Sequence, residues 1–324
     1  MRRIPFLALA MGAAMISACA NTAATTTTSG TTTSGPATTT TAATTTTEVT
    51  GFPVTIETAT GPVTIPGQPR SIISLSATAT EMLFAIGAGD QVVAVDEFSD
   101  FPAEAPTTDL SGFTPNVEAI ASYAPDLVVL SFDPEGLVAS LASLDIPVIQ
   151  HGAAVTIDDT YTQIEQLGAA TGRMAEAVGL VAEMQTAIDE LVATLPSSAQ
   201  GRTYYHELDD TLFSVTSTTF IGQLYSLLGL VNIADGSDPS GFGYPQLSAE
   251  VVVEADPDFI FLADTVCCGQ NQATVAARPG WQTLQAVVGG RVIELDDAIA
   301  SRWGPRVVDF LEIVAGAVAG VPVG

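Results

Sequence analysis

"NVEAIASYAPDLVVL", residues 116–130, has a counterpart in "SAEVVVEADPDFIFL", residues 248–262. In each stretch a Glu is followed after six residues by Pro-Asp and then by a four-residue apolar run. The two Glu residues lie 250 − 118 = 132 positions apart. Short, continuous apolar runs are typical of parallel strands that helices cover on both faces. The repeat therefore predicts two pseudo-equivalent α/β lobes.

The segments around the repeat extend the same pattern. "SIISL", "QVVAV" and "IPVIQ" alternate with amphipathic stretches in the first half, and "TYYHEL" begins a second such series. This alternation predicts an α/β fold with a mainly parallel sheet in each lobe. Residues 173–195 carry apolar side chains at three-four spacing and end before Pro196, which predicts one long helix of roughly 34 Å joining the lobes.

These elements place the lobe boundaries. We expect an N-terminal lobe at 51–155, a connecting helical segment at 156–200 that includes the long helix, and a C-terminal lobe at 201–324. Each lobe is of ordinary domain size and long enough to bury a core.

The N-terminus has the pattern of an export signal. Arg2 and Arg3 precede an apolar run, 4–18, that is too short to span a bilayer as a helix. The sequence Ile-Ser-Ala before Cys19 resembles the lipobox of bacterial lipoproteins, which implies a signal peptide at 1–18 and lipidation of Cys19. The alternative is an ordinary signal peptide with an incidental cysteine.

A low-complexity segment follows Cys19. Residues 21–47 contain only Asn, Thr, Ala, Ser, Gly and Pro, so they have no side chain able to seed a core. We expect a disordered tether at 19–50 and a protein held by its lipid at the outer face of the cell membrane.

Charge and cysteine content limit the partners and the kinds of site that the chain can have. The 9 Lys and Arg against 36 Asp and Glu give a net charge of −27, which argues against nucleic acid as a partner. Cys267 and Cys268 have no cysteine partner but each other once Cys19 is lipidated. A vicinal disulfide, two free thiols and a metal site all stay open, although only His151 and His206 could complete a metal set.

Several blocks, in order along residues 54–320, resemble the class III substrate-binding proteins of ABC importers, which take up ferric siderophores, haem and cobalamin. They include "PRSIISLSATATEMLFAIG" (69–87), "FIGQLYSLLGLVNIA" (220–234), "AARPGWQTLQAVVGGRVIELDD" (276–297) and "SRWGPR" (301–306). The resemblance implies two lobes joined by a long helix, a ligand bound between them and delivery to a membrane permease. We expect a monomer that binds an iron chelate or a corrinoid.

Glu118 and Glu250 match the pair of lobe-surface glutamates with which this family docks onto arginines of the permease. The residues alone support a second interpretation, because Asn116 and Ser248 look like helix N-caps. Each Glu would then lie in a first helical turn, where the helix dipole favours a carboxylate.

Ligands of open α/β sheets bind beyond the carboxyl ends of the strands. Arg302 is the candidate to hold a carboxylate, phosphate or chelate oxygen, with an ion pair to an acidic side chain as the alternative. His206 could bind haem iron or be a buried neutral group. Tyr244 matches a family position that often contacts ligand. The expected ligand-binding residues are Phe98, Phe113, Phe132, His206, Tyr244, Cys267, Cys268, Arg302 and Trp303.

An enzyme is the rival class, but the sequence has no G-x-S-x-G, H-E-x-x-H, P-loop or dinucleotide fingerprint. We therefore expect no catalytic residues, resident metal or cofactor. A haem- or metal-ion-binding lipoprotein and a ligand-sensing domain also stay open as functions, and a surface hydrolase is the least favoured.

Overall fold

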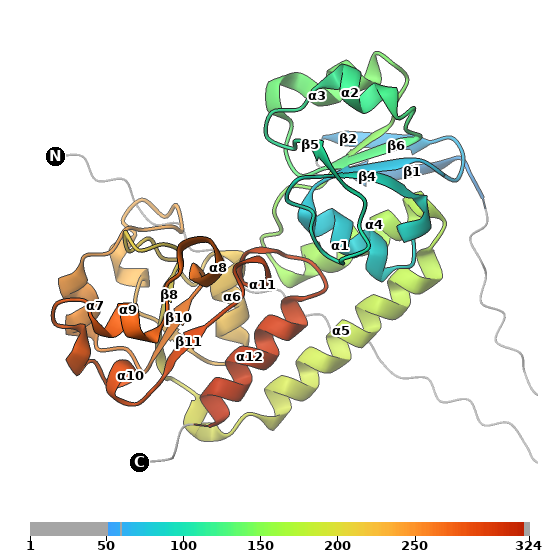
Figure 1. Cartoon of the computed structure of the whole chain (residues 1–324). Helices are drawn as coiled ribbons and strands as arrows, with labels where there is room; N and C mark the ends of the chain where they lie inside the picture. Colours follow the sequence, from blue (N-terminus) through green and yellow to red (C-terminus); the bar gives the residue numbers. More distant parts are fainter. Residues whose placement is uncertain (1–50, 59, 321–324) are drawn as a thin grey trace, which may run out of the picture. The chain divides into compact units, whose positions relative to one another are not determined.

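The computed structural model describes residues 51–58 and 60–320, which contain two mainly parallel sheets (Figure 1). The predicted signal peptide at 1–18 and the predicted tether at 19–50, with Cys19, lie outside the described residues. The two sheets confirm the fold class predicted from the alternating pattern.

The first sheet is parallel and has five strands in the order β5-β4-β3-β6-β7. Its central strand is buried on both faces: Ile72 packs with one core cluster, and Ile73 with another. An antiparallel hairpin, which the sequence analysis did not predict, precedes it. The strands are β1 (Val54–Thr58), β2 (Gly61–Ile65), β3 (Ile72–Leu75), β4 (Val92–Asp96), β5 (Thr107–Leu110), β6 (Leu127–Leu130) and β7 (Val148–Gln150).

Helices cover both faces of this sheet. Residues of α1, α4 and α5 belong to the core cluster that contains Ile72, and residues of α2 and α3 to the cluster that contains Ile73. Ser76 caps α1 by accepting a hydrogen bond from the Ala79 N–H. The helices are α1 (Ala77–Ala85), α2 (Val117–Ser122), α3 (Leu137–Ala142), α4 (Ile157–Thr171) and α5 (Met174–Thr194).

The second sheet has four parallel strands in the order β11-β10-β8-β9, namely β8 (Thr203–Glu207), β9 (Val231–Asn232), β10 (Phe259–Leu262) and β11 (Val292–Glu294). Its larger helices are α6 (Phe220–Leu227), α7 (Ala249–Ala255) and α12 (Val307–Ala319). Shorter helices follow its strands: α8 (Thr265–Cys268), α9 (Gln272–Ala276), α10 (Gln285–Val288) and α11 (Asp297–Ser301).

The repeated Pro-Asp pair has the same structural role in both sheets. The Asp126 carboxylate accepts hydrogen bonds from the N–H groups of Arg70 and Ser71, just before β3. The Asp258 carboxylate accepts one from the N–H of Thr203, the first residue of β8. In each sheet this aspartate precedes the strand that pairs with the strand it caps. The repeat in the sequence therefore reflects equivalent strand pairs.

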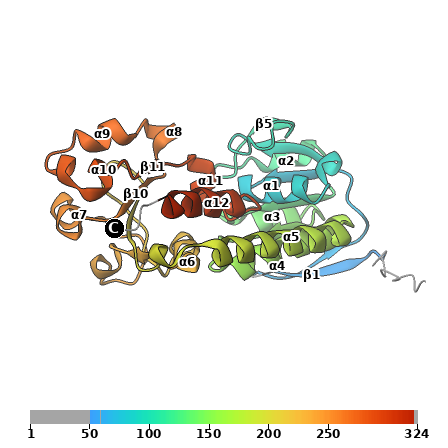
Figure 2. The same ribbon diagram turned by 90° about the horizontal axis from the view of Figure 1, so that it is seen from below.

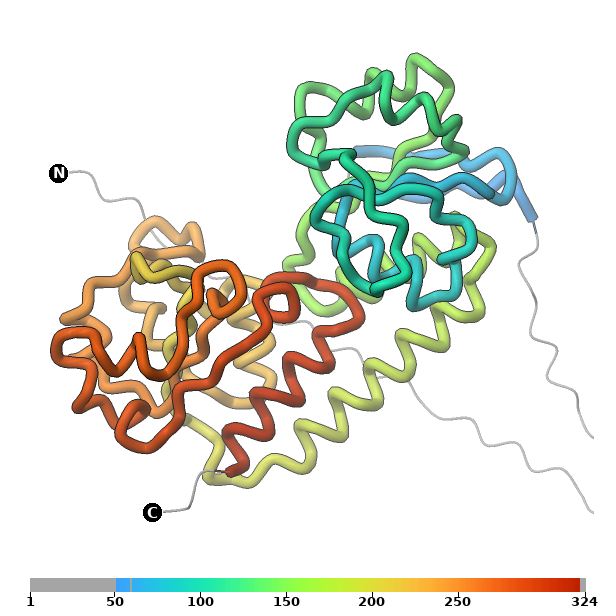
Figure 3. Tube along the Cα trace, viewed as in Figure 1, coloured from blue at the N-terminus to red at the C-terminus, as the bar shows by residue number. Residues whose placement is uncertain are grey.

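The helix predicted over 173–195 is α5, of 21 residues. It packs on α4, and Gly168 permits the close approach, because a Cβ there would clash with the Ala177 Cβ. Figures 2 and 3 show the chain passing from the first sheet through α5 to the second, with α12 returning beside α5. One core cluster includes residues of both sheets, α5 and α12.

Candidate functional site

A pocket of about 300 Å³ lies at the carboxyl ends of β3, β4 and β6. Its lining includes Leu75 and Asp96, which end β3 and β4, and Ser131, which follows β6. Two residues from the far end of the chain, Arg302 and Trp303, complete it. The pocket therefore lies where a parallel sheet places its ligands.

Three of the predicted aromatic residues meet at this pocket and form what we call the aromatic cluster: Phe98, Phe113 and Phe132. The ring of Phe113 lies 5.5 Å from Phe98, edge to face, and 5.4 Å from Phe132. Their side chains are 53%, 62% and 38% exposed, respectively. A cluster of rings this exposed is a surface suited to a large apolar or planar ligand.

Residues 301–306, which we call the SRWGPR segment, bind α4 through both backbone and side chains. The Trp303 indole N–H donates to Oε1 of Gln163 at 2.9 Å, and the Trp303 carbonyl accepts from the Thr160 hydroxyl at 3.0 Å. Both partners lie on α4. These contacts fix the indole at the edge of the pocket.

Arg302 is committed to acidic and carbonyl partners. It donates to Oε1 of Glu81 at 2.8 Å, to the Phe98 carbonyl at 3.0 Å and to Oδ1 of Asp100 at 3.0 Å. Arg306 also binds Glu81, through two hydrogen bonds of 2.9 and 2.6 Å. The ion-pair alternative for Arg302 is thus the arrangement in this structure, and the two arginines share a buried carboxylate.

Asp96 is a pocket residue that the sequence analysis missed. It is buried, accepts a 2.6 Å hydrogen bond from the Ser99 hydroxyl, and burial raises its pKa above the ordinary range. A Cβ at Gly112 would lie 2.8 Å from its Oδ2, so only glycine fits beside it. Its position at the carboxyl end of the apolar run "VVAVD", residues 92–96, could have indicated a pocket residue.

His206 does not face this pocket. Its side chain is completely buried, Nδ1 lies 2.9 Å from the Tyr225 hydroxyl, and burial lowers its pKa to about 3. The expectation that it binds ligand or haem iron therefore does not fit its position, since a strand in the middle of a sheet places it in the core. Tyr244 is 41% exposed and packs against Phe242 on a loop outside the pocket.

Cys267 and Cys268 form a disulfide on the exposed helix α8, directly after β10. Gly269 ends this helix in the left-handed conformation, at φ 70°. Of the three states that the sequence leaves open for this pair, the structure has the vicinal disulfide. Neither cysteine lines the pocket described above.

Glu118 and Glu250 are both exposed, in the first turns of α2 and α7. Asn116 and Ser248 cap these helices as predicted, each accepting a backbone N–H bond. Hydrogen bonds from the backbone and from Ser248 lower the pKa of Glu250, so it is ionised at neutral pH. The two carboxylates thus occupy equivalent surface positions in the two lobes.

Within the described residues, no group of three or more His, Cys, Asp and Glu side chains is arranged to hold a metal ion. Among the helices of the same residues, none combines the length and apolar character needed to cross a membrane.

Comparisons with known proteins agree with this geometry. Residues 72–299 match the family described as periplasmic binding protein. The chain is 30% identical over 275 residues to an uncharacterized ABC transporter substrate-binding lipoprotein of Bacillus subtilis, YvrC, covering 82% of this chain and 85% of that one. It is 31% identical over 277 residues to a cobalamin-binding protein of Halobacterium salinarum, covering 82% and 74%.

A solved structure is similar as well. The periplasmic vitamin B12 binding protein BtuF of Vibrio cholerae superimposes with a TM-score of 0.63 at 27% identity, covering 78% of this chain and 97% of that one.

Proposed function

The chain belongs to the periplasmic binding proteins, and from this premise we propose that it captures a corrinoid outside the cytoplasm and delivers it to an ABC importer. The relatives named for cobalamin or vitamin B12 support this choice of ligand over an iron chelate or haem.

The proposal depends most on the charge of the pocket, which favours a ligand without a net negative charge. Arg302 is the pocket's one cationic side chain among the described lining residues, and Glu81 and Asp100 already neutralise it. Asp96 adds a further acidic group. An anionic ligand such as haem, with its two propionates, would therefore meet no uncompensated positive charge in a chain of net charge −27. A corrinoid is rich in neutral amide groups and carries no such penalty.

The aromatic cluster supports the same ligand class. Exposed rings at the mouth of the pocket can pack against the flat, largely apolar face of a corrin ring. The polar side chains that line the pocket, among them Ser76, Thr78 and Ser131, can form hydrogen bonds with the amide groups at the edge of a corrin ring.

Delivery to the permease would use the two lobe-surface glutamates. Glu118 and Glu250 are exposed and do not line the pocket, so they are available to arginines of a membrane partner without disturbing it. We further propose that lipidation of Cys19 holds the protein at the outer face of the membrane, a feature that the described residues do not include.

Calorimetry of the purified mature protein against cyanocobalamin, haemin and a ferric trihydroxamate tests the ligand. We expect about one cyanocobalamin per chain, bound at least tenfold more tightly than the other two. Preferential binding of haemin would contradict the charge argument, and preference for the hydroxamate would return the ligand to the iron chelates.

A further inference from the structure

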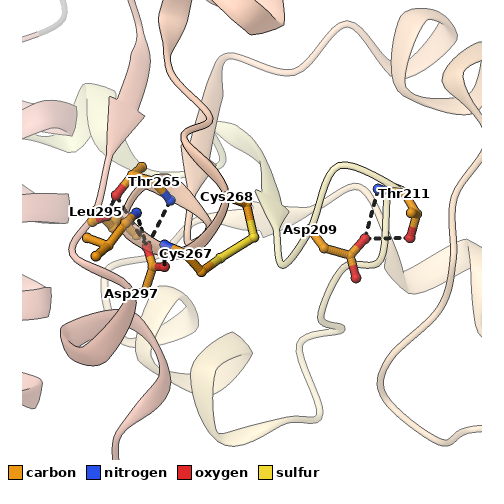
Figure 4. The surroundings of a disulfide bond; sticks show 8 residues. Asp209, Thr211, Thr265, Cys267, Cys268, Leu295 and Asp297 are labelled. Atoms are coloured by element: carbon orange, nitrogen blue, oxygen red, sulfur yellow. Dashed lines mark hydrogen bonds between the residues drawn. A yellow bond between two sulfur atoms is a disulfide. The ribbon is translucent and has the colours of Figure 1, made fainter.

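The disulfide turn, residues 265–268, is held by a single carboxylate. Oδ1 of Asp297 accepts hydrogen bonds from the N–H groups of Thr265 and Val266 at 2.8 and 3.0 Å, and Oδ2 accepts one from Cys267 at 2.7 Å. The Thr265 hydroxyl also donates to the Leu295 carbonyl at 2.5 Å. Figure 4 shows the sulfur bridge extending away from the carboxylate. The turn is therefore fixed on one side and presents its sulfur atoms on the other.

The same residue connects the turn to the pocket. Asp297 is the first residue of α11, and Arg302, which lines the pocket and binds Glu81, is the C-cap of that helix. Five helical residues rise about 7.5 Å along the axis. The disulfide turn and the pocket edge are thus attached to opposite ends of one short helix, and α8 contacts α11 directly.

The pocket alone is small for the proposed ligand. Its volume of about 300 Å³ is at the lower end of the roughly 300–1,000 Å³ typical for drug-sized molecules, and a corrinoid is larger than those. Further contact surface is needed. The disulfide turn lies at the carboxyl end of β10, the equivalent in the C-terminal lobe of the strand end at β6, and its apolar surface is exposed, with Val266 at 73%.

We propose that the disulfide turn is the C-terminal-lobe wall of the corrinoid site, opposite the aromatic cluster, and that Asp297 is the positioning residue that sets it. This inference rests on the proposed function. A disulfide of adjacent residues is compact, apolar and polarizable, so it can pack against a flat ring as a thioether does. Three backbone hydrogen bonds to one carboxylate order the wall before ligand arrives, which lowers the entropic cost of binding.

The first test measures reduction of the disulfide in the wild-type protein by dithiothreitol, with and without saturating cyanocobalamin, by alkylation and intact mass. If ligand covers the turn, cyanocobalamin slows reduction by tenfold or more. Binding of cyanocobalamin with an unchanged reduction rate would overturn this inference while leaving the proposed function intact. Failure of the wild-type protein to bind cyanocobalamin would instead overturn the proposed function.

A pair of neighbouring aspartates provides matched variants for the second test. Asp297→Asn weakens the three backbone hydrogen bonds that hold the disulfide turn. We expect cyanocobalamin affinity to fall by about five- to thirtyfold and the ligand-free disulfide to be reduced faster. Asp296→Asn is the control, because the Asp296 side chain does not bond the disulfide turn: it caps α11 through the N–H groups of Ala298 and Ile299, and asparagine caps equally well.

The cysteines themselves give a third comparison. The Cys267→Ser, Cys268→Ser double variant should bind cyanocobalamin at least tenfold more weakly with a melting temperature close to that of the wild type. Equal affinity in Asp297→Asn, Asp296→Asn and the wild type, or normal binding by the double serine variant, would remove the turn from the site.

Discussion

Arg302 at the end of α11 donates to Glu81 in α1 at 2.8 Å, so the C-terminal part of the chain is tied to the N-terminal lobe at the edge of the pocket. Glu81 is 3% exposed and also receives both hydrogen bonds of Arg306. A buried carboxylate that serves two arginines is costly to leave partly unpaired. We therefore expect this cluster to determine how the SRWGPR segment sits against the ligand.

A double-mutant cycle of Arg302→Ala and Glu81→Gln measures this contact. We expect a coupling free energy of about 1.5–3 kcal/mol in chemical unfolding, the range for a buried charge-assisted hydrogen bond. The exposed pair Arg173–Glu176, with a 3.3 Å contact, is the control and should couple by less than about 0.5 kcal/mol. Equal coupling in the two pairs would show that Glu81 does not hold the segment.

The sequence predicted the two lobes because the features that specify them are local and repeated. Buried strands read as apolar runs, and Asp126 and Asp258 follow a proline at the same place in each unit because each caps a neighbouring strand. The antiparallel hairpin β1–β2 was missed, since its strands are half exposed and so do not read as continuous apolar runs.

The candidate site was predicted less completely, because pocket walls depend on contacts between distant residues. Strand ends indicated the aromatic cluster, and five of the nine predicted ligand residues line one pocket: Phe98, Phe113, Phe132, Arg302 and Trp303. No local signal told that Arg302 would meet Glu81, 221 positions earlier. His206 was predicted because it lies near the carboxyl end of β8. The sequence does not show whether such a residue is still inside the strand, with its side chain in the core, or already in the loop that faces a ligand, and His206 is buried within the strand.

The aromatic cluster should contribute to ligand affinity. Phe113→Ala removes the most exposed ring and its contacts with both neighbours, so we expect cyanocobalamin affinity to fall by about 1–2 kcal/mol, or roughly five- to thirtyfold. Stability should change little, because the ring is 62% exposed. Calorimetry measures the affinity, and Tyr123→Ala, an exposed aromatic outside the pocket, is the control. Similar losses in both variants would assign the effect to the surface in general.

Replacement of both Glu118 and Glu250 by Gln should spare cyanocobalamin binding and impair uptake by whole cells. The carboxylates are exposed, so unfolding stability should change little. Gln substitutions at Glu183 and Glu190, two exposed acids on α5, change the net charge equally and should leave uptake normal. Normal uptake by the Glu118, Glu250 variant would show that the two residues do not dock the permease, and would leave them only the role of stabilising their helix dipoles.

Asp264 immediately precedes the disulfide turn and is completely buried beside the Glu207–Arg278 ion pair. Neither oxygen of its carboxyl group has a hydrogen-bond partner among the described residues. Burial, followed by the negative charge of Glu207, raises its pKa to about 7. The folded protein therefore retains a proton that the unfolded chain releases near pH 4, and stability falls as pH rises from about 4 to about 7.

Asp264→Asn should remove this loss, because the amide has a similar shape and does not ionise. We expect the variant to be more stable than the wild type by on the order of 2–4 kcal/mol at pH 8, with the difference shrinking toward zero as pH falls to about 4. Urea unfolding at a series of pH values measures it. Asp109→Asn, at an exposed position on β5 with no hydrogen bond from its side chain among the described residues, is the control and should give no comparable difference. A gain in Asp264→Asn that does not change with pH would mean that folding leaves the pKa of this carboxyl group unshifted, and that packing rather than charge separates the two proteins.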